Sequence, residues 1–364
     1  MFRLKRLMLK GFKSIREMEI ELGSLSVLVG PNGAGKSNLL SFFRMMEAIR
    51  QQKLQPFVGA QGGANAILHH GRKRTPDLGA KLVYDADPSG EAAYSIVLTG
   101  APLDDLVFLS EELAHAPADG GPARKVLIPG GRRESSLPEE RERTRKKMQP
   151  MPWGAATWRF AYHHFLDTSL DASIKQEGAV SDDRLLRQDG GNLAAFLYSM
   201  KVSSPEHYMH IRDTVRAAAP FFDDFVLMPD VFNPAMIRLE WRERGTDMPL
   251  SAHHLSDGTL RFIALATVLL QPEMPDDPCT LLIDDPELGL HPYTLGLLAD
   301  MMREASRRTQ LIVATQSISL LHALAEAEEV IVVERSGGQS FFRRLEGSKF
   351  GSWRDVHAFG ALAL

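Results

Sequence analysis

The segment LSVLVGPNGAGKSN, residues 25–38, constrains the fold more than any other part of the sequence. The run LSVLV predicts a buried strand, and the apolar residues between Lys36 and about Arg50 recur at helical spacing. Between strand and helix lies a match to the pattern G-x-x-x-x-G-K-[ST]. A strand, a glycine-rich loop and a helix in this order are typical of a phosphate-binding loop in an α/β sheet.

The residue types in this loop suit the phosphates of a nucleotide. The glycines let the backbone curl so that N–H groups point inward, and the following helix adds its positive end. Lys36 supplies a charge for the β- and γ-phosphates, and the Ser37 hydroxyl can ligate Mg²⁺. The predicted nucleotide-binding residues of the loop are Gly30, Pro31, Asn32, Gly33, Ala34, Gly35, Lys36, Ser37 and Asn38.

A phosphate loop of this kind needs a second strand that ends in a metal-binding carboxylate. The segment TLLIDDPE, residues 280–287, provides an apolar strand followed by Asp284 and Asp285. We expect Asp284 to hold Mg²⁺, directly or through water, and Asp285 to face the γ-phosphate and orient a water molecule. The alternative is that DDPE only terminates a strand.

A third segment, LSDGTLRFIALATVLL at residues 255–270, starts with small polar residues and continues as an apolar helix. Ser256 is a candidate N-cap, and the N-terminus of a helix is a further anion site. On these residues alone, an ordinary capped helix is the favoured reading. A second anion site would be explained if this helix N-terminus binds the γ-phosphate of an ATP molecule that is held by another copy of the protein.

In this order, the three segments resemble the heads of ATP-binding-cassette (ABC) ATPases, specifically the RecF/SMC branch. The segments FKSI, LSDGT, LLIDDPELGLHP and LIVATQS stand where that branch has its opening, signature motif, Walker B region and switch strand. The stretches LQPFVGAQGGANAILHHG and FLDTS are similar to a bacterial group of RecF-like, AAA-family ATPases. The resemblance extends over most of the chain, least over residues 101–155.

The resemblance implies an α/β fold, the ABC-type P-loop NTPase head, with an N-terminal antiparallel β lobe and a helical insertion. It implies one head over residues 1–364. Its predicted parts are an N-terminal lobe at 1–110, a helical insertion at 111–235 and a C-terminal lobe at 236–364. The charged run at about 130–152 is predicted to be a mobile surface segment.

The resemblance also implies ATP and Mg²⁺ as cofactors and a homodimer as the working form. In this family two heads sandwich two ATP molecules, and each ATP meets the phosphate loop of one head and the signature motif of the other. On this chain Ser256 and Gly258 would act on the partner's nucleotide, and His291 falls where the D-loop approaches the partner head. The catalytic residues are then Lys36, Asp285 and Gln316.

Two positions depart from the family pattern. Asp285 stands where the family usually has glutamate, and a base displaced by about 1 Å can lose on the order of 10²-fold in rate. Gln316 stands where the family usually has histidine, and glutamine donates to a phosphate but takes up no proton near neutral pH. Together the two departures predict slow hydrolysis and long-lived ATP-bound dimers.

Several other polar residues have two readings each. His164 and Asp167 follow a predicted strand and either reach the metal or γ-phosphate or form a polar strand end. Gln55 and Gln61 are too near the first helix to be assigned as the glutamine of the family's Q-loop.

The pairs His69–His70 and His163–His164 do not predict a metal site, because neighbours on a strand point to opposite faces. The basic triplet Arg72–Arg74 is a solvated loop in the favoured reading and a DNA contact in the other.

Periodicity also predicts the elements outside these motifs. The predicted strands lie at 2–9, 15–22, 80–87, 92–100 and 235–243, with a weaker one within 156–169. The predicted helices lie at 192–200 and 207–220. Residues 51–78 and 114–123 are predicted to be irregular.

Composition narrows the class of protein. The formal net charge of −4 argues against a wholly basic nucleic-acid binder and leaves room for a local basic patch. The single cysteine, Cys279, excludes an intrachain disulfide and is expected to be buried. We expect a cytoplasmic protein, because the sequence has no signal-peptide pattern and no apolar run long enough to span a membrane.

The favoured function is therefore an ATPase that pairs head to head around ATP and acts as a clamp or switch in DNA repair, DNA maintenance or phage defence. DNA and a separately encoded effector protein are candidate partners. The alternative is a non-catalytic ATP sensor that regulates a partner toxin or nuclease. A nucleotide-binding subunit of a transporter is less favoured.

Overall fold

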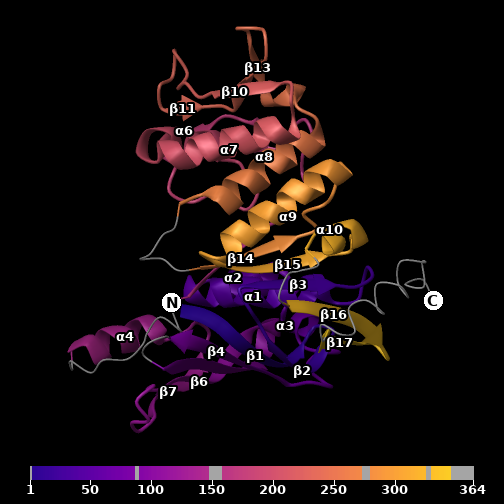
Figure 1. The fold of residues 1–364 in the computed structure, drawn as a ribbon. Helices are drawn as coiled ribbons and strands as arrows, with labels where there is room; N and C mark the ends of the chain where they lie inside the picture. The colour runs from indigo at the N-terminus through magenta and orange to yellow at the C-terminus, as the bar shows by residue number, and fades with distance from the viewer. Residues whose placement is uncertain (1, 87–89, 147–157, 273–278, 325–328, 346–364) are drawn as a thin grey trace. The chain divides into compact units, whose positions relative to one another are not determined.

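The computed structural model describes residues 2–86, 90–146, 158–272, 279–324 and 329–345 (Figure 1). The chain divides into two compact units. The first unit is Met1–Ala161, Pro275–Leu282 and Ala327–Leu364, and the second is Tyr162–Met274 and Ile283–Glu326. The predicted lobe boundaries at residues 110 and 235 stay predictions.

The first unit contains a six-stranded antiparallel sheet with the strand order β2-β1-β4-β5-β6-β7 (Figure 1). Its strands are β1 Phe2–Phe12, β2 Ile15–Glu21, β4 Asp77–Ala86, β5 Glu91–Gly100, β6 Leu106–Ala116 and β7 Arg124–Arg132. In the register of the sheet, Leu7 lies opposite both Ile20 and Leu82, and Leu82 lies opposite Tyr94. All four side chains are buried, so this face of the sheet is part of the core. The predicted N-terminal β lobe is confirmed.

The first unit also contains the strand and helix that flank the glycine-rich loop. Strand β3 (Leu25–Val29) is buried at every residue and pairs in parallel with β16 (Glu329–Ser336). Strand β16 also pairs with the next strand, β17 (Gln339–Arg344), and the two form an antiparallel hairpin. Helix α1 (Lys36–Arg50) buries the apolar face that its spacing predicted. The bounds of β3 and α1 match the sequence prediction.

Residues 51–78, predicted to be irregular, contain two helices, α2 (Leu54–Ala60) and α3 (Ala64–Ile67). The carboxylate of Glu134 accepts hydrogen bonds from Leu54 N at 2.8 Å and from Gln55 N at 3.0 Å. A carboxylate at a helix N-terminus satisfies N–H groups that the helix itself cannot bond. The stabilising residue is distant in the sequence, so local periodicity does not reveal α2.

The run at 130–152, predicted to be mobile, is in part regular structure. Its first residues complete β7, helix α4 spans Leu137–Lys146, and residues 147–152 lie outside the described residues. The segment just before α4 is held by buried Glu111, which accepts from Ser135 Oγ at 2.6 Å and Ser136 N at 3.1 Å. Residues 114–123 were likewise predicted to be irregular, but β6 continues to Ala116.

The second unit is mainly helical. Its helices are α6 Leu193–Ser203, α7 Pro205–Ala218, α8 Asp257–Leu270, α9 Pro292–Ser306 and α10 Ile318–Ala323. Helix α7 packs on α8, and α8 packs on α9 (Figure 1). The predicted helices at 192–200 and 207–220 are therefore confirmed as α6 and α7.

Short strands complete the second unit. They are β9 Gly178–Ala179, β10 Phe222–Val226, β11 Met236–Ile237, β12 Glu240–Glu243, β13 Pro249–Ser251 and β15 Gln310–Thr315. The strand predicted at 235–243 is broken, because β11 pairs with β9 whereas β12 pairs with β10 and β13. Single turns of 3₁₀ helix lie at Pro102–Asp104, Ser173–Lys175 and Ala252–His254.

Two strands contribute residues to both units. They are β8 (Arg159–His163) and β14 (Cys279–Asp284). Cys279, predicted to be buried, is half-buried at the start of β14.

Candidate functional site

The predicted phosphate-binding loop joins β3 to α1, and its surroundings require two of its glycines. A Cβ atom at Gly30 would lie 2.1 Å from the carbonyl oxygen of Val333 on β16. Gly35 has a φ of +119°, and a Cβ atom there would lie 2.1 Å from Ser340 Oγ on β17. The β16–β17 hairpin therefore leaves no room for a side chain at either glycine of the loop.

The side chain of Lys36 is buried within the loop. Its Nζ donates to the carbonyl oxygens of Gly30 at 2.7 Å and Pro31 at 3.2 Å. Helix α1 starts after Gly35 with no side-chain cap, and Ser37 is exposed. A buried cation, an uncapped helix N-terminus and an exposed hydroxyl are the groups that phosphates and their Mg²⁺ bind.

The β16–β17 hairpin also hydrogen-bonds to the loop. Arg335 Nη1 donates to the carbonyl oxygen of Gly33 at 3.2 Å, and Ser340 Oγ donates to that of Ala34. Ser340 Oγ also lies 2.7 Å from Ser14 Oγ of the FKSI segment. Sequence reasoning missed both hairpin residues, because no local pattern marks a side chain that contacts the loop from some 300 residues away.

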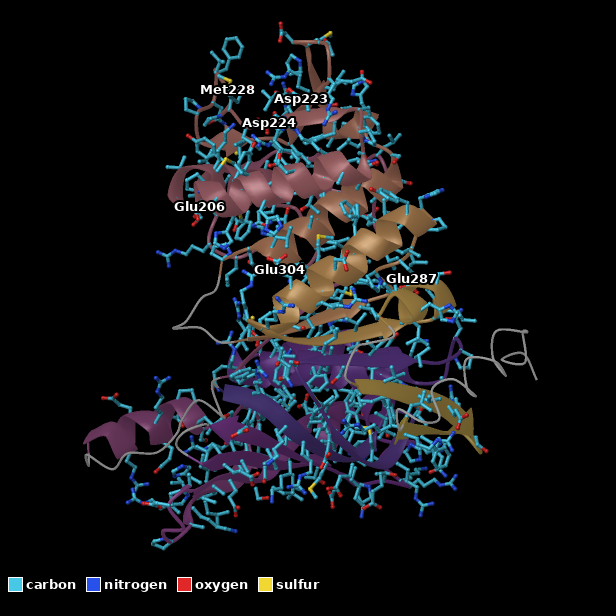
Figure 2. All side chains as sticks on the ribbon, in the orientation of Figure 1. Glu206, Asp223, Asp224, Met228, Glu287 and Glu304 are labelled. Atoms are coloured by element: carbon cyan, nitrogen blue, oxygen red, sulfur yellow. The ribbon has the colours of Figure 1, made fainter. Side chains whose placement is uncertain are left out.

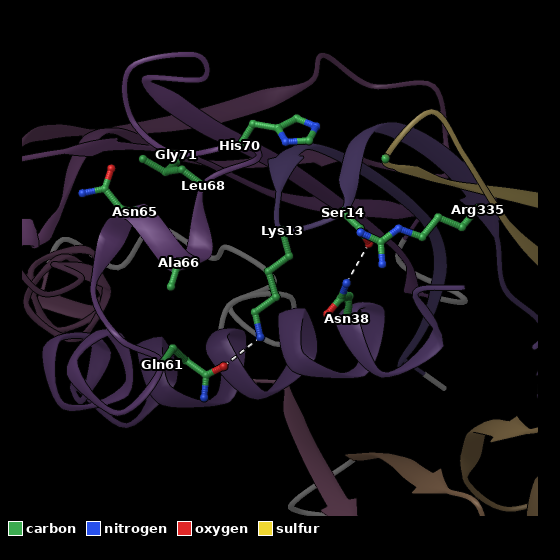
Figure 3. Close-up of a pocket in the computed structure, with 11 residues that line it drawn as sticks. Lys13, Ser14, Asn38, Gln61, Asn65, Ala66, Leu68, His70, Gly71 and Arg335 are labelled. Carbon is green, nitrogen blue, oxygen red and sulfur yellow. Dashed lines mark hydrogen bonds between the residues drawn. The ribbon is translucent and has the colours of Figure 1, made fainter. Parts of the chain in front are cut away.

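A pocket of about 590 Å³ opens beside Asn38, the last residue of the loop (Figure 3). Asn38 Nδ2 donates to Ser14 Oγ at 2.6 Å, and Lys13 Nζ donates to Gln61 Oε1 at 2.7 Å, as the dashed lines in Figure 3 show. Arg335 and His70 also line this pocket. Its lining is thus polar and carries two cationic side chains.

Lys13 lies in a strained turn between β1 and β2, with a φ of +45°. Its N–H donates to Ile67 O at 2.6 Å, and its carbonyl oxygen accepts from His69 Nδ1 at 2.7 Å. Burial is the main reason that the pKa of Lys13 is lowered, and the charge of Arg44 adds to it. A half-buried ammonium group is thus fixed at the edge of the pocket.

The expectation that His69 and His70 point to opposite faces is wrong. The two residues follow α3 rather than belonging to a strand, and His70 has a φ of +57°. Their rings contact each other with centroids 4.1 Å apart.

In the second unit, β14 ends at Asp284, as predicted, and this side chain is buried. Tyr162 Oη donates to Asp284 Oδ2 at 3.3 Å. The next residue, Asp285, has a φ of +45°, and its N–H donates to Ala314 O at 2.9 Å. Asp285 Oδ1 is buried and has no hydrogen-bond partner among the described residues, so a water molecule or a metal-bound ligand can satisfy it.

A small cavity brings His164 together with both aspartates. Its volume is about 10 Å³, which is close to the size needed for a single water molecule. His164 Nε2 is buried and, within the described part of the chain, accepts or donates no hydrogen bond. Asp167 is instead exposed and accepts from Ser169 N and Oγ, which lower the pKa of its carboxyl group. Of the two candidates, His164 therefore lines the cavity with Asp284 and Asp285, whereas Asp167 does not.

Arg261 on α8 lines the same cavity and was missed at the sequence level. Its guanidinium donates to the carbonyl oxygens of Phe165 at 3.0 Å, Leu166 at 2.8 Å and Leu288 at 3.1 Å. One side chain thus connects helix α8 to the segment after His164 and to the segment after Asp285.

Ser256 is the N-cap of α8, as predicted, and its Oγ accepts from Thr259 N at 3.2 Å. Its side chain is exposed. Gly258 is required within the subunit, because a Cβ atom there would lie 2.2 Å from Gly289 O. The action of either residue on a partner's nucleotide stays a prediction.

His291 caps α9, where its Nδ1 accepts from Tyr293 N at 3.2 Å. It is exposed, and its approach to a partner head stays a prediction.

Gln316, just after β15, is also exposed, and its N–H donates to Glu287 Oε1 at 3.1 Å. Glu287 is a further residue that the sequence patterns did not single out.

The remaining candidates have local structural partners. Gln55 Nε2 donates to Leu106 O at 2.8 Å and to Arg133 O at 2.6 Å. Arg72 Nη1 donates to Ala101 O at 2.7 Å, whereas Lys73 and Arg74 are exposed.

Each of the two predicted Mg²⁺ ligands, Ser37 in the first unit and Asp284 in the second, carries an oxygen donor. Oxygen donors are what Mg²⁺ in nucleotide enzymes binds together with phosphates and water. Among the described residues, no group of three or more His, Cys, Asp or Glu side chains forms a metal site of its own.

Comparison with protein families gives two matches. The family model described as "AAA domain, putative AbiEii toxin, Type IV TA system" matches residues 131–322, just over half of the chain. A second model, described as "AAA domain", matches residues 6–46, which include the phosphate-binding loop. No curated protein matches the chain.

Comparison with solved structures identifies the fold. One similar structure is the crystal structure of an SMC head bound to the C-winged helix domain of ScpA, with a TM-score of 0.58. Its sequence is 19% identical to this one, and the match covers 95% of this chain and 99% of that chain. The Smc head from Pyrococcus furiosus, with an extended coiled coil and bound to the C-terminal domain of ScpA, is 17% identical, with a TM-score of 0.57, over 98% of this chain and 99% of that one.

At these identities the likeness shows the fold alone. The chain has the fold of the SMC head, an ABC-type P-loop ATPase fold, and this part of the sequence prediction is confirmed. In the described parts of the chain, no helix is both long enough and apolar enough to cross a membrane.

Proposed function

Because the chain belongs to the family described as "AAA domain, putative AbiEii toxin, Type IV TA system", we propose that it hydrolyses ATP at its phosphate-binding loop with Mg²⁺ as cofactor. The observation that carries the proposal is the loop itself, where Lys36 is buried against two loop carbonyl oxygens beside the uncapped start of α1. This arrangement binds phosphates through N–H groups and a fixed cation.

We assign the ribose and base of ATP to the pocket beside Asn38 (Figure 3). Its volume of about 590 Å³ lies in the range of small-molecule sites. The fixed positions of Lys13, Ser14 and Asn38 support this assignment, because their mutual hydrogen bonds and those of their neighbours hold the wall of the pocket in place.

The proposed roles follow from the chemistry of each side chain. Ser37 and Asp284 provide oxygen ligands for Mg²⁺, which neutralises charge on the phosphates when bound. Asp285 accepts a hydrogen bond from the attacking water, and Gln316 donates to the γ-phosphate. Because the side chain of Asp285 is shorter than the glutamate usual at this position, we expect hydrolysis to be slow.

We further propose that two copies pair around ATP, with Ser256 and Gly258 of each copy facing the nucleotide of the other. The exposure of Ser256 at the N-terminus of a long helix supports this pairing, since that helix end attracts anions. The capping hydrogen bond of Ser256 fits an ordinary helix start as well, so pairing needs its own test.

The proposed biological role is an ATP-timed clamp or switch in DNA repair, DNA maintenance or phage defence. Exposed Lys73 and Arg74 are available to a DNA backbone. A second candidate is an ATP sensor that regulates a separately encoded toxin or nuclease. The aspartate at position 285 favours this candidate, and so does the toxin–antitoxin system named in the family description.

The test of ATPase activity is phosphate release from radiolabelled ATP, with single-turnover conditions to capture a slow reaction. The native protein should release phosphate, and Lys36→Ala should lose both nucleotide binding and turnover. Lys10→Ala, at an exposed position on β1, is the matched control and should behave as the native protein. Equal turnover in Lys36→Ala and the native protein would show that the activity does not belong to this loop.

A further inference from the structure

Glu287, which is labelled in Figure 2, lies two residues after Asp285 in the sequence and accepts three hydrogen bonds through one oxygen. Its Oε1 accepts from Thr315 Oγ1 at 2.7 Å, from Gln316 N at 3.1 Å and from Ser317 N at 3.1 Å. These three donors are consecutive residues that run from the last residue of β15 to the N-cap of α10. A single carboxylate oxygen therefore holds the whole turn that carries Gln316.

A second contact connects the same two segments through the backbone. The N–H of Asp285 donates to Ala314 O at 2.9 Å, one residue before the donors that Glu287 accepts. Ser317, in turn, caps α10 through the hydrogen bond from Leu320 N to Ser317 Oγ at 3.1 Å. The segment Asp285–Glu287 and the segment Ala314–Ser317 are thus joined along their length.

Burial makes this use of a carboxylate costly. Glu287 Oε2 is buried and makes no hydrogen bond within the described residues. Burial is also the first cause of the raised pKa of Glu287, with the nearby charge of Asp285 acting in the same direction. A neutral residue at this position would avoid the cost of burying the charge.

We propose that Glu287 is a positioning residue for ATP hydrolysis, which holds Gln316 at a fixed separation from Asp285. The inference rests on the proposed function, because Asp285 and Gln316 are the residues that act on the attacking water and the γ-phosphate. Without the Glu287 acceptor, Thr315 Oγ1, Gln316 N and Ser317 N lose the hydrogen bonds that join them to the segment after Asp285. The backbone contact at Ala314 then still connects the two segments.

The competing account is that Glu287 only stabilises the fold. The chain offers a control, since buried Glu111 also accepts three hydrogen bonds from hydroxyl and backbone N–H groups. Glu111 accepts from Tyr94 Oη at 2.5 Å, from Ser135 Oγ at 2.6 Å and from Ser136 N at 3.1 Å. None of these partners belongs to the phosphate-binding loop or to the turn that carries Gln316.

The experiment measures kcat, KM and thermal stability for Glu287→Ala, Glu287→Gln and Glu111→Ala in the full chain. Glu287→Ala should lower kcat about tenfold or more with little change in KM, because a small displacement of a group near the reacting atoms has a large effect on rate. Glu287→Gln keeps an acceptor oxygen and should retain most of kcat. Glu111→Ala should lose stability without a selective loss of kcat.

If Glu287→Ala does not fold, Glu287→Asp replaces it, since the carboxylate then keeps its charge but is one methylene too short to reach the turn. The proposal is overturned if kcat of Glu287→Ala, or of Glu287→Asp in its place, stays near the native value, or if Glu111→Ala lowers kcat as much as Glu287→Ala. Failure of the proposed function is a separate result, because the native protein itself would then release no phosphate from ATP.

Discussion

At the scale of single residues, several buried polar atoms of the second unit belong to residues that line the cavity at Asp284 and Asp285 or that follow it in the sequence. Asp285 Oδ1, His164 Nε2 and Glu287 Oε2 are buried and have no hydrogen-bond partner in the described parts of the chain. Buried polar groups in folded proteins are nearly always bonded, so each exception needs a reason. A reaction site that admits water and phosphate gives one reason for all three.

The length of the Asp285 side chain should limit the rate of hydrolysis. We predict that Asp285→Glu raises turnover about tenfold or more, because the carboxylate then reaches the position usual in the family. Asp285→Asn should bind ATP and hydrolyse almost none. A lower rate for Asp285→Glu would show that the left-handed backbone at this residue, with a φ of +45°, is suited to aspartate and that slow hydrolysis has another cause.

Glu287 should make stability depend on pH in a defined direction. Its folded-state pKa is raised, mainly by burial, so the folded chain holds this proton more strongly than the unfolded chain does. The stability linked to this group is fully present below the usual glutamate pKa of about 4.3 and is lost as pH rises through the raised folded pKa. The melting temperature of Glu287→Gln relative to the native protein should therefore increase from pH 5 to pH 8, and a difference that stays constant would contradict the raised pKa.

At the scale of elements, Arg261 joins α8 to two segments that the sequence separates widely. Its three carbonyl partners lie after β8 and after β14. Arg261→Ala should lower the free energy of unfolding by about 2–3 kcal/mol, since it leaves three acceptors without their donor. Denaturant unfolding measures this, with exposed Arg184→Ala as the control that should change little. An equal effect of the two substitutions would show that the carbonyl contacts contribute nothing.

The elements also show where sequence reasoning succeeds. Strand β3 and helix α1 match their predicted bounds because their apolar spacing is local and strong. Helices α2 and α4 were missed because the residues that hold their starts are distant in the sequence. Glu134 accepts from the first N–H of α2, and Glu111 accepts from Ser136 N, just before α4. For the same reason the phosphate loop was predicted from its motif, whereas the hairpin residues Arg335 and Ser340 that fasten it were not.

The contact between α8 and the segment after β14 decides which substitution can test pairing. A side chain at Gly258 would collide with Gly289 O of the same subunit, so a Gly258 variant disturbs the fold before it disturbs a dimer. Ser256 is exposed and has no such neighbour in the described structure, because its side chain bonds only within the first turn of α8. Ser256→Arg is therefore the cleaner probe.

At the scale of the whole molecule, the chain has the fold of an SMC head. The central claim is that ATP held by the loop of one copy brings the signature helix of a second copy onto it. An exposed helix N-terminus and exposed Gln316 are compatible with such a closure, since both can reach a γ-phosphate from the surface.

The most direct test is the mass of the full chain in solution, measured by sedimentation with and without ATP and Mg²⁺. We predict that the native protein changes from one copy to two when ATP is added, that Lys36→Ala stays single because it binds no nucleotide, and that Ser256→Arg binds ATP but stays single. A native protein that remains a single copy with ATP bound, or a Ser256→Arg variant that still pairs, would contradict the account.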